Sequence, residues 1–140
     1  MIFILFWFIS IFNLESQQKI HLGDISLKLQ NLKNKKGKIL ISLFKSKNGF
    51  PDNEKESFKY WVETPGNEIV LKKVEFGTYA VSLLHDEDGN YQMTYNFFRF
   101  PKEGFAFSNF EASFLKIPEF EECKFEHKAA STTVKLKIVY

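Results

Sequence analysis

The sequence predicts an all-β protein, an antiparallel sandwich of about seven short strands. Three observations carry this prediction. Apolar and polar residues alternate with a period of two in several segments, which is typical of half-buried strands. Turn-forming residues separate these segments at short intervals. No stretch shows the repeating apolar spacing of an amphipathic helix.

The first half of the sequence contains three of the expected strands. Residues 25–29 alternate, and a polar turn at 31–38 separates them from the apolar, β-branched run 39–44. We expect these two runs to pair as a first hairpin. A loop of turn-forming residues at 48–53 then leads to a third alternating segment at 58–62.

The second half continues this pattern but also contains a long irregular region. A strand is expected at 68–71, and residues 78–85 are apolar on both faces, as in a central strand. Tyr79 follows a glycine and a threonine, the pattern of a tyrosine corner that ties a strand to an upstream backbone carbonyl. Residues 91–125 read as loops, and the last strand is expected at 132–139.

The amino-terminal residues predict export. The apolar run 2–12 is shorter than the roughly 20 residues that a membrane-spanning helix needs, but it has the length of a secretory signal core. Cleavage near Ser16 would divide the chain into a signal peptide, 1–16, and one sandwich domain, 17–140. No Lys or Arg precedes the apolar run, so an anchor or a buried first strand is the alternative interpretation. The mature chain is expected to contain no membrane span.

The net charge argues against a nucleic-acid-binding protein, and the cysteine content excludes an internal disulfide. The formal net charge is +2, and loss of 1–16 removes one acid, Glu15, and no base, which gives +3. This weak charge argues against nucleic acid as a partner. Cys123 is the only cysteine, so the chain forms no internal disulfide, and its neighbours Phe120 and Phe125 favour burial of the thiol.

Two segments carry a family resemblance. Residues 77–90 read GTYAVSLLHDEDGN, and residues 101–109 read PKEGFAFSN. They resemble the two signature segments of the DUF2141 family, G-x-Y-A…HDENGNG and P-x-E-G-x-x-F-S-N. The resemblance spans about 25–139 and implies an exported bacterial protein, periplasmic or extracellular, with an immunoglobulin-like or transthyretin-like sandwich. It implies no activity, because the family is uncharacterised.

The acidic loop after the central strand has two interpretations. Asp86, Asp88 and Asn90 place oxygen ligands at alternate positions, as a calcium loop does at its start. Against a calcium site, Tyr91 stands where the family has a glycine, Thr94 stands where it has a second acid, and no bidentate Glu closes the loop. The sequence therefore permits a weak calcium site, but it favours a turn in which Asp and Asn side chains bond to their own backbone.

The two signature segments also define a candidate binding rim. We expect the loops 85–91 and 101–109 to lie side by side, with Lys102 or Arg99 neutralising Asp86 or Asp88. His85 points away from Asp86 on a strand, so the two cannot easily share an ion, but a strand-end histidine remains accessible to a ligand. The candidate ligand-binding residues are His85, Asp86, Asp88, Asn90, Glu103, Ser108 and Asn109.

The irregular region is rich in phenylalanine. One interpretation is that the rings anchor the loops to the sandwich, which the sequence favours; the other is a ring-lined groove for a sugar, peptide or other extracytoplasmic partner. The nine rings are Phe97, Phe98, Phe100, Phe105, Phe107, Phe110, Phe114, Phe120 and Phe125.

The sequence gives little support for catalysis. Ser108 lacks the Gly-x-Ser-x-Gly context of a nucleophile, and no Gly-rich phosphate loop opens a helix. We therefore expect an exported, non-catalytic binding or accessory module that acts through the 85–91 and 101–109 rim on an unknown ligand or protein. The alternatives are an envelope hydrolase that uses His85, Asp86 or Glu103, and a purely structural envelope module.

Export predicts a shortened chain. In cells that produce the protein with a carboxyl-terminal tag, amino-terminal sequencing should show a mature chain that starts near Gln17, recovered from the extracytoplasmic fraction. An intact Met1 on cytosolic protein would contradict the prediction.

Overall fold

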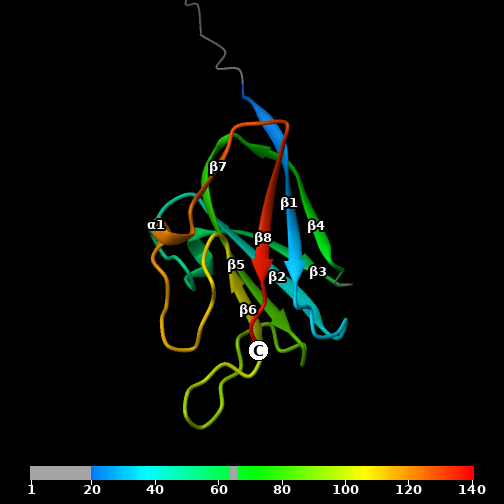
Figure 1. Ribbon diagram of the computed structural model, residues 1–140, viewed down its shortest axis with the longest axis vertical. Helices are drawn as coiled ribbons and strands as arrows, with labels where there is room; N and C mark the ends of the chain where they lie inside the picture. Colours follow the sequence, from blue (N-terminus) through cyan, green and yellow to red (C-terminus); the bar gives the residue numbers. More distant parts are fainter. Residues whose placement is uncertain (1–19, 64–65) are drawn as a thin grey trace, which may run out of the picture.

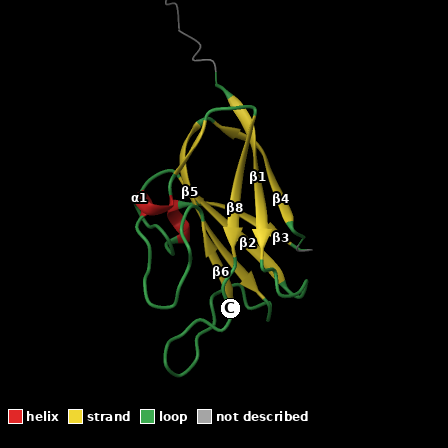
Figure 2. Cartoon of the chain, viewed as in Figure 1, coloured by secondary structure: helices red, strands yellow, loops and turns green. Residues whose placement is uncertain are grey.

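Two β-sheets face each other across an apolar core (Figures 1 and 2). The computed structural model describes residues 20–63 and 66–140, so the expected signal peptide lies outside the described residues. The strands are β1 (Leu22–Gln30), β2 (Lys38–Phe44), β3 (Phe58–Val62), β4 (Glu68–Glu75), β5 (Gly77–Asp86), β6 (Gly104–Phe107), β7 (Phe125–His127) and β8 (Ser131–Lys137). The two short helices are a 3₁₀ turn at Glu54–Glu56 and α1 at Phe120–Cys123.

The predicted all-β sandwich is confirmed. One sheet has the order β4-β1-β8, and the other has the order β3-β2-β5-β6, with β7 pairing to the start of β5. All strands expected from alternation are present, although β4 continues to Glu75 and β8 ends at Lys137. In the described ranges, the structure contains no helix with the length and apolar character that a membrane crossing requires.

The expected first hairpin is wrong. β1 pairs antiparallel with β4 and parallel with β8, whereas β2 pairs with β3 and β5. The polar turn after β1 therefore carries the chain from one sheet to the other. Alternation indicates which face of a strand is buried but not which strand lies beside it, and the buried faces of β1 and β2 meet across the core.

β5 is the central strand that its two apolar faces predict. It pairs with β2 on one side and with β6 and β7 on the other. Tyr79, Val81 and Leu83 point into the core between the sheets. The predicted tyrosine corner is confirmed, because the Tyr79 hydroxyl donates a hydrogen bond of 2.8 Å to the Glu75 carbonyl.

The outer face of the five-stranded sheet carries a second, smaller core. Phe44 on β2 and Ala80 on β5 pack against Phe120 and Cys123 of α1. The expected burial of Cys123 is confirmed, since the residue has no exposed surface. Burial raises the pKa of its thiol to about 12, which keeps it protonated. α1 and its loops thus cover one end of this outer face.

Removal of the corner hydrogen bond should destabilise the sandwich. We expect Tyr79→Phe to lower the free energy of unfolding by about 1 kcal/mol, because a buried hydroxyl–carbonyl bond is lost while the ring remains. Urea denaturation measures the change. Tyr60→Phe is the control, since Tyr60 packs against the same core. Equal losses in the two variants would contradict a special role for the corner.

Candidate functional site

The carboxylate of Asp86 organises the acidic loop at the end of β5. Its Oδ1 accepts hydrogen bonds from the backbone N–H groups of Gly89 (2.8 Å) and Asn90 (3.2 Å), and its Oδ2 accepts one from Tyr91 (2.9 Å). The residue is fully buried. Gly89 and Tyr91 both have left-handed backbone conformations, with φ of 77° and 66°. Three amide donors on one buried carboxylate hold this tight turn in place.

Glu103 approaches the same loop from the residue before β6. Its Oε1 accepts the backbone N–H of Glu87 (3.1 Å), and its Oε2 accepts that of Thr94 (2.9 Å), although only 3% of the residue is exposed. Desolvation raises the pKa of the Glu103 carboxyl, and the charges of Asp88 and Asp86 raise it further. Glu103 therefore ties both ends of the acidic loop to the sheet.

Three carboxylates converge at this point, in an arrangement that a calcium ion could use. One oxygen from each of Asp86, Asp88 and Glu103 lies within 4.8 Å of the others, and carboxylate oxygens are ligands that calcium prefers. The Asn90 side chain also serves the turn, because its Oδ1 accepts the backbone N–H of Gln92 (2.9 Å) and its amide donates to Asp88 Oδ2 (3.1 Å). The donor atoms suit calcium, but the carboxylates of Asp86 and Glu103 already bind backbone amides, so the loop has a complete structural role without an ion.

The expected neutralisation by a cation is wrong. In the described part of the chain, neither Lys102 nor Arg99 forms a salt bridge with Asp86 or Asp88. Backbone N–H groups replace the expected side-chain cations. The sequence carries no signal for these donors, because every residue except proline has a backbone N–H.

His85 is placed inside the sandwich rather than at an accessible rim. It is fully buried, its Nδ1 lies 2.7 Å from the Tyr140 hydroxyl, and its Nε2 lies 2.8 Å from the Lys36 carbonyl oxygen. Both ring nitrogens therefore have hydrogen-bond partners within the protein. Its buried position makes His85 a packing residue that joins β5 to the residues after β1 and β8.

Ser108 and Asn109 lie at the other end of β6 from the acidic cluster. The Ser108 hydroxyl donates to the Cys123 carbonyl (2.7 Å) and accepts the Val81 N–H (2.8 Å). The Asn109 amide donates to the Lys124 carbonyl (2.8 Å). Because the four residues of β6 lie between them, Ser108 is separated from Glu103 by roughly 17 Å of strand. The structure thus brings together only the Asp86, Asp88, Asn90 and Glu103 part of the expected rim.

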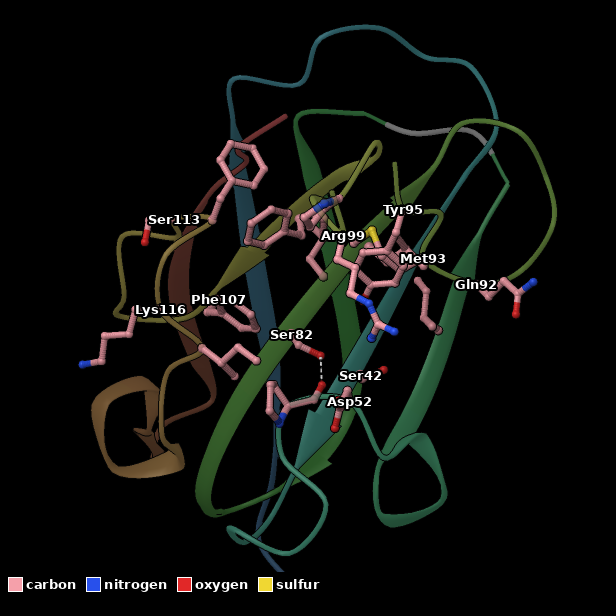
Figure 3. Close-up of a pocket in the computed structure, with 18 of the residues that line it drawn as sticks. Ser42, Asp52, Ser82, Gln92, Met93, Tyr95, Arg99, Phe107, Ser113 and Lys116 are labelled. Carbon is pink, nitrogen blue, oxygen red and sulfur yellow. Dashed lines mark hydrogen bonds between the residues drawn. The ribbon is translucent and has the colours of Figure 1, made fainter. Parts of the chain in front are cut away.

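A pocket of about 620 Å³ opens beside this cluster on the outer face of the five-stranded sheet (Figure 3). Leu40 and Leu84 from β2 and β5 form its floor with the rings of Phe105 and Phe107 from β6. The loop 92–101 forms one wall, the loop 113–117 forms another, and the loop that contains Pro51 and Asp52 closes a third side. The volume falls in the range of about 300–1,000 Å³ typical of small-molecule sites.

The aromatic segment is divided between core and surface. Phe105 and Phe120 are buried, with 8% and 7% exposure, as the anchoring interpretation expects. In contrast, Phe97 and Phe98 are 94% and 75% exposed at the tip of the 92–101 loop. Phe114 contacts the rings of both Phe100 and Phe105, so the two walls meet beside the pocket. The anchoring interpretation therefore holds for only part of the segment.

Comparison with known proteins places the chain in a family. The model of the family described as "Uncharacterized protein conserved in bacteria (DUF2141)" matches residues 27–135. The chain belongs to DUF2141. The match covers most of the sandwich of this DUF2141 protein, including β5, the acidic loop and the pocket walls. Neither a curated protein nor a solved structure matches the chain.

Several residues that line the pocket of this DUF2141 protein were not predicted from the sequence. Met93, Tyr95, Leu115 and Ile117 occupy its walls, and the last two are 92% and 74% exposed. Their only signal in the sequence is the presence of large apolar residues in segments without regular alternation. That signal is weak, because isolated apolar residues are common on protein surfaces.

The two aspartates of the loop should contribute unequally to stability. We expect Asp86→Ala to lower the free energy of unfolding by about 2–4 kcal/mol, because it leaves three backbone donors without their acceptor. Asp88→Ala, at an exposed position in the same loop, should cost less than about 1 kcal/mol. Chemical denaturation of both variants measures the difference, and equal losses would contradict the assignment of Asp86 as the organising residue.

A thermal melt with and without calcium distinguishes a purely structural turn from a calcium site. With the carboxylates already bound to backbone amides, the melting temperature of the unaltered protein should be the same in EDTA and in about 1 mM calcium. A saturable rise that is absent from the Asp86→Ala/Asp88→Ala double variant would show a calcium site instead.

Proposed function

We propose that this DUF2141 protein is an exported, non-catalytic binding module that takes a small, largely apolar ligand into the pocket on the outer face of its five-stranded sheet. The observation that carries the proposal is the pocket itself: a concave site of about 620 Å³ whose floor and walls come mainly from aliphatic and aromatic side chains.

The exposed apolar residues around the pocket support this proposal. Tyr95 and Leu115, from the two facing loops, are 57% and 92% exposed, and Ile117 and Phe114 are also exposed. Soluble proteins rarely keep apolar side chains clustered in contact with water unless the cluster binds something. A ligand in the pocket would remove part of this surface from water, which is favourable.

The acidic rim supports the same site indirectly. Glu103 binds the backbone of Thr94, and the Asn90 side chain donates to the Thr94 hydroxyl (2.7 Å), so the start of the 92–101 wall is fixed to the end of β5. In the proposal, the signature residues of the rim position the wall of the site and do not touch the ligand. A rigid wall lowers the entropy lost on binding.

The positions of the candidate acid–base groups support a non-catalytic role. The pocket lining contains none of His85, Asp86, Asp88 and Glu103. His85 uses both ring nitrogens within the protein, and the Asp86 and Glu103 carboxylates accept backbone N–H groups. A hydrolase of the kind considered from the sequence would need a nucleophile with a base, or a pair of carboxylates, beside the bound substrate, and the lining contains the single carboxylate Asp52. Export rests on the apolar run 2–12 of the sequence.

A neutral, polarity-sensitive dye tests the proposal. N-phenyl-1-naphthylamine should bind the purified protein saturably with a rise in fluorescence, and Leu115→Asp/Ile117→Asp should weaken binding about tenfold or more. The reason is that two apolar contacts are replaced by charges at the pocket wall. Because both side chains are exposed, the melting temperature should change little.

The matched control is Ile20→Asp. Ile20 is also exposed, but it precedes β1 and does not line the pocket, so this variant should bind the dye as the unaltered protein does. Absence of saturable binding, or equal binding by all three proteins, would contradict the proposed site.

A further inference from the structure

We infer that the pocket selects an anionic amphiphile, a free single-chain molecule with an apolar body and a carboxylate head, and that Arg99 binds the head group. This inference rests on the proposed function, since it names the ligand class of the same pocket. It is carried by Arg99, a cation without an ionic partner in a mainly apolar lining that also contains Asp52 and Lys116.

Arg99 has no ionic partner of its own. Over residues 20–63 and 66–140, its side chain forms no salt bridge, side-chain hydrogen bond or cation–π contact, although the chain is rich in Lys–Glu pairs. The residue lines the pocket, and its side chain extends toward the side formed by Ser42 and Asp52 (Figure 3). A guanidinium carries five N–H donors in a planar fork that matches a carboxylate.

The backbone holds Arg99 in an unusual conformation. Its φ is 64°, in the left-handed region that non-glycine residues rarely adopt. Asn96 stabilises the turn, because its Oδ1 accepts the N–H groups of Phe98 (2.9 Å) and Phe100 (3.0 Å), and its carbonyl accepts that of Arg99 (3.0 Å). The turn therefore presents the one arginine of the chain at the pocket in a fixed backbone geometry.

The other charges of the lining leave Arg99 as the available anion-binding group. Lys116 forms an ion pair with Glu122, and Figure 3 shows its side chain directed away from the pocket. Asp52, on the side toward which Arg99 extends (Figure 3), is the one acid in the lining, and the two side chains form no salt bridge with each other. A ligand carboxylate at Arg99 would leave the apolar chain against Leu40, Leu84 and Phe107 on the floor.

Displacement of N-phenyl-1-naphthylamine by three twelve-carbon ligands tests the inference. Dodecanoate, dodecanol and dodecylammonium have the same apolar chain with an anionic, a neutral and a cationic head, and each is used as a monomer. We expect dodecanoate to bind at least about tenfold more tightly than dodecanol, because a charge-assisted hydrogen bond adds to the apolar contacts. Added salt should reduce this preference.

Arg99→Gln should remove the preference without removing the pocket. Dodecanoate affinity should fall about 10- to 100-fold and dodecanol affinity much less, so that the two ligands bind about equally well. Glutamine meets the same left-handed backbone cost as arginine, so the loop should be retained. The matched control, Lys102→Gln, removes a positive charge that does not line the pocket and should leave all affinities unchanged.

Asp52→Asn gives an independent result of opposite sign. Removal of the one acidic side chain in the lining should tighten dodecanoate binding by a few fold, because a like charge is removed. The inference is overturned if dodecanoate binds no better than dodecanol. It is overturned if Arg99→Gln and Lys102→Gln weaken dodecanoate binding equally. It is overturned, too, if dodecylammonium binds best and its affinity falls in Asp52→Asn. It is also overturned if the protein binds phosphatidylglycerol vesicles but no monomeric dodecanoate.

These outcomes are distinct from failure of the proposed function. If the dye and all three amphiphiles fail to bind, the pocket is not a ligand site at all. If the dye and dodecanol bind and the head group has no effect, the pocket is a ligand site but the assigned ligand class is wrong.

Discussion

The double-sided burial of β5 is the constraint on which the rest of the structure depends. Its inner face completes the core between the sheets, which is how most sandwich strands are used. Its outer face carries Ala80 and Leu84 on either side of Ser82, and a layer outside the sandwich covers part of this face. α1 and its flanking loops cover the end near Ala80, where Phe120 and Cys123 pack. They leave the end near Leu84 as the floor of an open pocket.

The charged residues next to β5 have a mainly architectural part in this arrangement. Asp86 and Glu103 are buried carboxylates, which are costly to desolvate, and backbone N–H groups offset that cost. The acidic signature of DUF2141 in this chain is therefore a means of ending a buried strand and fixing the loop beyond it. In the proposed function, the groups that would contact a ligand lie instead in the loops that this scaffold holds, and Arg99 is one of them.

The sequence predicted what depends on local pattern and failed where contacts are distant. Alternation and two-sided apolarity located the strands and the central position of β5, and Gly77-Thr78-Tyr79 located the corner. The pairing of β1 with β8 was missed, because strand partners are decided by packing across the whole domain. β6, β7 and α1 are three or four residues long, too short to show a period.

The sequence predicted which residues form the acidic cluster only in part, and it could not predict which of the candidate residues lie next to one another. The clustering of Asp86 with Asp88 follows from their spacing, but the approach of Glu103 depends on the register of β6 against β5. That same register carries Ser108 away to α1. Position in the fold also decides the burial of the rings. Phe105 lies on β6 and is buried, whereas Phe97 lies in the loop before β6 and is exposed, and the residue type alone does not distinguish them.

The parallel pairing of β1 with β8 also has a consequence for the order of folding. Ile25 lies beside Thr132, so β1, the middle strand of the three-stranded sheet, pairs with a strand more than a hundred residues later in the chain. Such long-range contacts slow folding, since the entropy of closing a long loop is lost before the contact forms. During synthesis from the amino terminus, the three-stranded sheet cannot be completed until residues 131–137 have left the ribosome. The three-stranded sheet of the nascent chain therefore stays incomplete until β8 has emerged.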